Sequence, residues 1–154
     1  MKIFDRQQKA ESLRTVSSGC NPLTLELPSL VENWSESLEE FDLSSSEIHG
    51  SIRNTIGDLT SLSKLSLWDN NLTGPIPGTL GRLPKIQELY LHDKLQGPIP
   101  ISLCQVRCIG NLFLSGNRIS GSIPSFFGNV TYFENSSIRQ QSVVIKHTSG
   151  VMQS

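Results

Sequence analysis

A repeat of about 24 residues constrains the fold of this chain more than any other feature. Its copies begin, at intervals of 25, 24, 24 and 23 residues, at Leu13, Leu38, Leu62, Ile86 and Ile109, and we assign a further start, 24 residues later, at Phe133. A fixed period of this size predicts a solenoid in which each copy forms one turn. The apolar residues of a turn are then shielded by the turns on either side.

The copy at 62–85 shows the layout of the repeat most clearly, as LSKLSLWDNNLTGPIPGTLGRLPK. Leucines at three spaced positions are followed by Asn-x-Leu and then by Gly-x-Ile-Pro. The segment LFLSGNRISGSIPSFFGNV at 112–130 repeats that layout. The copy from Ile86 is one residue short, between Leu91 and Leu95. One bend of the solenoid is therefore expected to depart from the others.

This layout resembles the plant-type leucine-rich repeat over residues 13–132, and the run resembles the extracellular domain of plant leucine-rich repeat receptor-like kinases and receptor-like proteins. The resemblance implies an α/β solenoid of about five turns. It would be right-handed, with a short parallel sheet on the concave side and 3₁₀ or irregular structure on the convex side. It also implies a protein- or peptide-binding module for signal perception in defence or development, located extracellularly or at the plasma membrane. A co-receptor ectodomain is a second expected kind of partner.

Alternating apolar and polar residues predict the strands of the concave sheet. The segments 40–43, 64–67, 88–91 and 111–114 are expected to be parallel neighbours with their apolar side chains inward. Where the chain bends after the strands, side-chain amides can bond open backbone groups, which predicts a structural ladder of Asn21, Asn70 and Asn117. The shortened copy has no clear residue at that position. We therefore predict a local distortion near Asp93 and Lys94.

Residues between the inward leucines form two columns that are predicted to face solvent: Asp42, Ser66, Tyr90 and Phe113 in one, and Ser44, Trp68, His92 and Ser115 in the other. Aromatic residues make up only 6% of the chain, so a cluster of exposed rings favours a binding patch. The candidate ligand-binding residues are Trp68, Tyr90, His92, Phe113, Asp42 and Ser66. The alternative is that these rings pack as a ladder that stabilises the strands, or contact neighbouring turns that this chain lacks.

Nothing in the sequence points to catalysis, and we expect no enzymatic activity, no cofactor and no metal site. The chain lacks the motif set of a kinase and a phosphate-binding loop. Its three cysteines, Cys20, Cys104 and Cys108, are expected to be small buried side chains, with a Cys104–Cys108 bridge or a metal site as the alternative. Lys and Arg number 13 against 14 Asp and Glu, so there is no electrostatic case for a nucleic-acid partner.

Four Asn-x-Ser/Thr sequences are glycosylation candidates, at Asn33, Asn71, Asn129 and Asn135. They would be used only in a secreted protein. No apolar run is long enough for a transmembrane segment, and residues 1–12 lack the apolar core of a signal peptide. These two observations conflict with the location that the resemblance implies.

The predicted organisation has four segments. A polar N-terminal segment covers 1–12, the leucine-rich repeats cover 13–132, a degenerate closing turn covers 133–145, and a polar tail that could be disordered covers 146–154. No recognisable cap is expected at either end, although solenoids need polar caps for solubility. We therefore infer a fragment of a longer repeat protein. The alternative to a binding module is a non-binding, truncated remnant of such a receptor with only a structural character.

Overall fold

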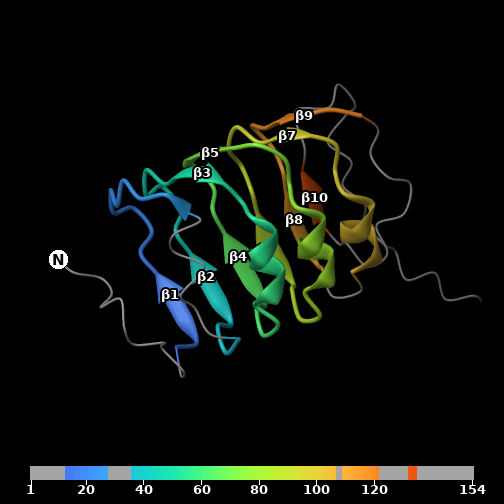
Figure 1. The fold of residues 1–154 in the computed structure, drawn as a ribbon, viewed down its shortest axis with the longest axis horizontal. Coiled ribbons are helices and arrows are strands. Elements are labelled where there is room, and N and C mark those ends of the chain that lie inside the picture. Colours follow the sequence, from blue (N-terminus) through green and yellow to red (C-terminus); the bar gives the residue numbers. More distant parts are fainter. Residues whose placement is uncertain (1–12, 28–35, 107–108, 122–131, 135–154) are drawn as a thin grey trace, which may run out of the picture.

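The computed structural model describes residues 13–27, 36–106, 109–121 and 132–134. Within these residues, six three-residue strands lie side by side in one sheet: β1 (Thr15–Ser17), β2 (Glu40–Asp42), β4 (Lys64–Ser66), β6 (Glu88–Tyr90), β8 (Asn111–Phe113) and β10 (Tyr132–Glu134). Each strand is parallel to its neighbours, and Figure 1 shows the chain advancing by one strand with every turn. The expected solenoid with a parallel sheet is confirmed.

The strand register follows the repeat. One continuous row of paired residues contains Val16, Phe41, Leu65, Leu89 and Leu112, the fourth position of each of the five predicted copies. The last four members of this row have no exposed surface. The copy starts assigned at 13, 38, 62, 86 and 109 are therefore correct.

The start assigned at Phe133 is wrong. Phe133 pairs with Leu112, which is the fourth residue of its copy, so by the same offset the last copy starts at position 130. Strand β10 also spans the boundary that was predicted between 132 and 133. Apolar residues recur closely between 126 and 133, so spacing alone left several starts open, and the hydrogen bonds to β8 select one of them.

The convex side carries short strands and 3₁₀ helices. The strands β3 (His49–Ser51) and β5 (Asn71–Thr73) form one parallel pair, and β7 (Gln96–Gly97) and β9 (Arg118–Ile119) form another. The 3₁₀ helices η1 (Asn54–Asp58), η2 (Gly78–Arg82) and η3 (Ile101–Gln105) follow, and Figure 1 shows them stacked across from the main sheet. The helices pack so closely that a Cβ at Gly81 would lie 2.5 Å from the backbone of Ser102.

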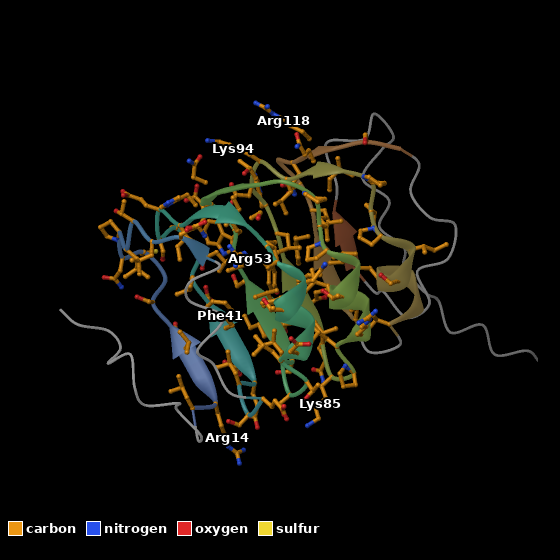
Figure 2. All side chains as sticks on the ribbon, in the orientation of Figure 1. Arg14, Phe41, Arg53, Lys85, Lys94 and Arg118 are labelled. Carbon is orange, nitrogen blue, oxygen red and sulfur yellow. The ribbon has the colours of Figure 1, made fainter. Side chains whose placement is uncertain are left out.

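A single apolar core fills the space between the main sheet and the 3₁₀ helices (Figure 2). The turns that begin at 38, 62, 86 and 109 contribute corresponding positions, because the same spacing recurs in these copies, whereas Val16 in the first turn is only half-buried. Among the described residues, the apolar side chains with no exposed surface are Phe41, Ile48, Leu62, Leu65, Leu67, Leu72, Leu80, Ile86, Leu89, Leu91, Leu95, Leu103, Ile109, Leu112 and Leu114.

Asparagine side chains join successive turns at the bend after the strand. Oδ1 of Asn70 accepts the backbone N–H groups of Ser46 at 3.1 Å and Ile48 at 3.0 Å. Its Nδ2 donates to the carbonyl oxygens of Leu43 at 2.8 Å and Leu67 at 2.9 Å. One amide therefore satisfies two donors and two acceptors on two turns, which is why asparagine suits this position.

The other two asparagines of the predicted ladder differ in which turns their side chains bond. Asn117 makes the same four kinds of bond between its own turn and the one before. Asn21 is exposed, and its Nδ2 reaches carbonyl oxygens of its own turn, those of Ser18 at 3.5 Å and Gly19 at 3.3 Å. Ser46 uses its hydroxyl to bond the carbonyl oxygens of Ser18 and Ser44, at 2.9 and 3.0 Å.

In the shortened turn this position is filled by Asp93, contrary to the expectation that no residue would occupy it. Asp93 stands two residues before the buried Leu95, as Asn70 stands two residues before Leu72. Only 6% of its surface is exposed, and its Oδ1 accepts the N–H of Lys94 at 3.0 Å. The missing residue is therefore absorbed in the bend, and the strands keep their register.

The cysteine expectation is wrong at Cys20, which is exposed with a free thiol and a left-handed backbone φ of 62°. The Cys104 side chain and Cys108 lie outside the described part of the chain, so the expectations for them remain predictions.

Candidate functional site on the concave face

The register of the main sheet brings the predicted columns together. Asp42, Ser66, Tyr90 and Phe113 lie in one row across β2, β4, β6 and β8. The residues two places further along are Ser44, Trp68, His92 and Ser115. Trp68 is 42% exposed and His92 is exposed, whereas the side chains of Tyr90, Phe113 and Asp42 are half-buried.

Three serines in these columns do not face solvent as predicted. Ser66 is 2% exposed, and Ser44 and Ser115 are 6% and 7% exposed. A serine side chain is short, and Ser66 lies in register between Asp42 and Tyr90, whose longer side chains shut water out. The candidate surface is therefore formed by the larger residues, without direct access to Ser66.

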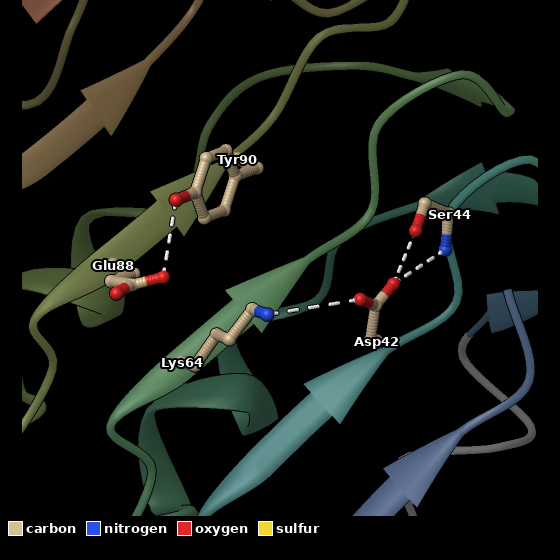
Figure 3. Close-up of polar contacts among 5 residues, drawn as sticks. All are labelled: Asp42, Ser44, Lys64, Glu88 and Tyr90. Atoms are coloured by element: carbon tan, nitrogen blue, oxygen red, sulfur yellow. Dashed lines mark hydrogen bonds and ion pairs between the residues drawn. The ribbon is translucent and has the colours of Figure 1, made fainter.

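Tyr90 and Phe113 form a stacked pair. Their ring centroids are 4.7 Å apart and the ring planes are inclined by 17°. Such a pair fixes both rings and presents a rigid apolar surface. The Tyr90 hydroxyl donates to Oε2 of Glu88 at 3.1 Å (Figure 3). Burial, together with the Glu88 carboxylate, raises the pKa of Tyr90 above its usual value, so the hydroxyl stays protonated as a donor.

Asp42 is held by Ser44, which follows β2, and by Lys64 on β4. Its Oδ1 accepts the backbone N–H of Ser44 at 3.1 Å and also the Ser44 hydroxyl (Figure 3). Its Oδ2 lies 3.9 Å from Nζ of Lys64. A partly exposed ion pair of this length contributes little stability, roughly 0–1 kcal/mol, so Lys64 is easily displaced from Asp42.

His92 is positioned by the following turn. Its Nδ1 lies 3.3 Å from Oγ of Ser115. A Cβ at Gly116 would lie 2.0 Å from Nε2 of His92, and Gly116 also has a left-handed φ of 73°. Only glycine at 116 leaves room for the imidazole at this place. The sequence signal for this contact is the Ser115-Gly116 pair, which the column pattern alone did not single out.

Sequence reasoning also missed the third column of the same face. Residues two places before the first column share its side of the sheet, because side chains alternate along a strand. This column contains Glu40, Lys64 and Glu88 in register. Alternation along each strand was the signal that could have found it.

The arrangement suits recognition of another molecule by shape, aromatic contact and hydrogen bonds. In the described residues no three His, Cys, Asp or Glu side chains gather as a metal site would require. No helix in that part of the chain has the length and hydrophobicity that crossing a bilayer requires.

Of the four glycosylation candidates, Asn71 alone falls in the described segments. It is exposed on β5, and its Oδ1 accepts from Nζ of Lys94 at 2.5 Å. Asn33, Asn129 and Asn135 lie outside the described residues, so they remain sequence predictions.

Comparison with known proteins finds the chain similar to leucine-rich repeat proteins of plants. The Leucine Rich Repeat family model matches residues 61–83 and 109–130, which flank the shortened turn. "Receptor-like protein 32" of Arabidopsis thaliana is 33% identical over 119 residues, covering 73% of this chain and 13% of that protein. "Receptor-like kinase TMK4" of the same plant is 33% identical over 72 residues, covering 46% of this chain and 8% of that protein. The chain thus spans 13% or less of the length of these two relatives.

Solved structures with this fold include LRR ectodomains of plant receptor kinases. The plant peptide hormone receptor RGFR1, in complex with RGF2, superposes with a TM-score of 0.72 at 32% identity, over 80% of this chain and 21% of that chain. A chain of the BIR3–SERK2 complex from Arabidopsis thaliana superposes with a TM-score of 0.62 at 32% identity, over 75% of this chain and 61% of that chain.

Proposed function

Because this chain is a plant-type leucine-rich repeat protein that resembles part of a receptor ectodomain, we propose that its concave face binds a peptide or a segment of a partner protein. The observation that carries the proposal is the group of rings on that face. Trp68 is 42% exposed beside the stacked pair of Tyr90 and Phe113, in a chain whose aromatic content is 6%. Aromatic anchors of this kind contribute most of the binding energy at protein interfaces.

The mechanism is recognition without chemical change. The parallel sheet holds the rings at fixed spacing, so little conformational entropy is lost when a ligand binds. Glu88, Lys64 and Asp42 lie beside the rings and can bond polar groups of a ligand. The protein would act in signal perception, outside the cell or at the plasma membrane, where a second ectodomain could join the complex. RGFR1 with RGF2 and the BIR3–SERK2 complex are similar folds that support this reading.

The proposal is tested by selecting ligands for the intact chain from a displayed library of random peptides. Binding of the selected peptides is then measured to the wild type, to the double variant Trp68→Ala with Tyr90→Ala, and to Ile101→Ala. Ile101 is a matched control, because it is 71% exposed but lies on η3 on the convex side. We expect the double variant to lose at least about tenfold in affinity and the control to lose none.

Equal binding by all three proteins would show that Trp68 and Tyr90 do not contribute to ligand binding. A wild-type chain that is not monodisperse, or that enriches no peptide, would favour the non-binding remnant instead.

We also propose Asn71 as a glycan acceptor when the chain is secreted, because its side chain is exposed in the sequence Asn-Leu-Thr. Expression in a secreting plant cell should give a mass increment that Asn71→Gln removes. If the Asn71→Gln variant keeps the mass increment, the glycan is attached to another residue.

A further inference from the structure

At the ladder position, Asp93 can accept hydrogen bonds as asparagine does, but its carboxylate cannot donate them. We call the hydrogen bonds that the side chain at this position makes between two turns the joint. In the regular turn, Asn70 accepts the N–H groups of Ser46 and Ile48, which lie on the turn before. The corresponding N–H groups for Asp93 are those of Asn70 and Leu72, and both lower the pKa of its carboxyl group, as nearby donors do. Asp93 therefore keeps the acceptor role of this position.

The donor half of the joint is missing. Nδ2 of Asn70 donates to the carbonyl oxygens of the two leucines that follow the strands, Leu43 and Leu67. By the repeat register, the corresponding carbonyl groups for Asp93 belong to Leu67 and Leu91. A carboxylate has no hydrogen to donate to them. Oδ2 of Asp93 is buried and has no hydrogen-bond partner among the described residues.

The surrounding charges only partly offset the cost of ionising the buried Asp93 carboxyl. The charged and titratable residues at the adjacent bends are His92 and Lys94 on its own turn, Asp69 on the turn before and Arg118 on the turn after. Nζ of Lys94 bonds Asn71, and Asp69 bonds Oγ of Ser45 at 2.8 Å. Figure 2 shows Lys94 and Arg118 extending outward from one edge of the molecule. Burial raises the pKa of Asp93 to about 6, against the opposing effect of backbone N–H groups and Lys94.

We propose that Asp93 makes the shortened turn a proton-dependent joint, in which the protonated carboxyl donates its Oδ2–H to a leucine carbonyl of the ladder as the asparagine amide does in the regular turns. The joint connects the turns that carry Trp68 and His92, so acidity controls how firmly these two residues are held relative to each other. This device is a property of the free chain and does not depend on ligand binding.

The sign of the effect follows from the two pKa values. Below the ordinary value of 3.8, the carboxyl is protonated in both the folded and the unfolded chain. Above about 6, it is ionised in both, and the folded chain holds a desolvated charge. The stabilisation is therefore complete below 3.8 and is lost as the pH rises through about 6. The two values differ by about two units, so this group alone lowers the folding constant by roughly 100-fold across that range.

The stability test compares the wild type with Asp93→Asn and with Asp69→Asn, by urea unfolding of the full chain from pH 4 to pH 8. Asp69 is a matched control, because it is an exposed carboxylate at the bend of the preceding turn. Between pH 5 and pH 7 the folding constant of the wild type should fall by roughly tenfold relative to Asp93→Asn. Asp69→Asn should keep the pH dependence of the wild type.

Parallel pH dependence in the wild type and Asp93→Asn would overturn the proposal. A second measurement needs no substitution. In the wild type, the ¹³Cγ resonance of Asp93 should titrate near pH 6, and the amide protons of Asn70 and Leu72 should shift with the same midpoint. The amides of Ser46 and Ile48, which bond a neutral asparagine, should not. A midpoint at or below pH 4 for Asp93 would also overturn it.

Discussion

The turn that contains Asn70 and the turn that contains Asp93 pair their strands alike but differ at the bend. Asp69, directly before Asn70, has a left-handed φ of 58°, whereas His92, directly before Asp93, has no positive φ. Their strands pair residue for residue, with Leu65 opposite Leu89, although the second turn is one residue shorter. Both pairings on the convex side also survive, with Pro75 bridged to Gln96 and β7 paired to β9. The comparison teaches that the solenoid tolerates a missing residue in this bend, because residues 92–95 carry no strand pairing.

What the shorter turn loses is concentrated in one side chain. Asn70 has bonds on both polar atoms of its amide, whereas Asp93 keeps an unbonded buried oxygen. A buried polar atom without a partner costs roughly 1–3 kcal/mol. The two turns should therefore be equal in their apolar cores and unequal in their bends, and each prediction below tests one side of that statement.

The largest effect is expected in the core, where the turns should be alike. Leu65→Ala and Leu89→Ala each remove a side chain with no exposed surface, so each should lower the free energy of unfolding by about 2–5 kcal/mol. Urea unfolding at pH 7 measures both. A much smaller loss for Leu89→Ala would show that the shortened turn is packed less well than the regular one.

The next effect separates the two bends. Asn70→Ala removes bonds to four backbone groups and should cost about 3 kcal/mol at pH 7. Asp93→Ala should cost less, because it also removes a buried charge. Urea unfolding measures both variants. Equal losses of unfolding free energy would contradict the proposed difference between the two joints.

Restoring the missing residue should make the two turns alike. Insertion of asparagine between Asp93 and Lys94 recreates the Asp-Asn order found at 69–70. We expect a gain of about 1–2 kcal/mol at pH 7, because the amide supplies the missing donors. Insertion of alanine at the same place is the control, and it should give no gain. A similar gain from both insertions would show that the short length of the turn, and not its missing hydrogen bonds, lowers the stability.

The smallest effect concerns the cation beside the joint. The positive charge of Lys94 lowers the pKa of Asp93, so Lys94→Gln should raise the titration midpoint by a few tenths of a unit. Lys64→Gln, which removes the partner of Asp42 on the concave face, should leave that midpoint unchanged. NMR titration of both variants measures the shifts, and an unchanged midpoint in Lys94→Gln would mean that solvent screens the charge.

Most of the fold was predictable because its signals repeat along the chain. Five copy starts, the inward row through Leu65 and Leu89, and the 3₁₀ segments follow from spacing that several copies share. The last copy was misassigned where apolar residues are closely spaced around Phe133. For the candidate site, alternation correctly predicted that Trp68 and His92 are exposed. It did not predict the burial of Ser66, because the length of a neighbour on another turn decides that.

The amino-acid sequence by itself determined the period, the apolar rows and therefore the stacking of turns, since these depend on intervals within one copy. The tertiary structure alone decided that Asp93 takes the place of asparagine, that His92 lies over Gly116, and that Tyr90 stacks on Phe113. Each of these contacts joins residues about one turn apart, so neither partner's local sequence specifies it. The packing of adjacent turns brings such residues within bonding distance and sets the burial that determines their chemistry.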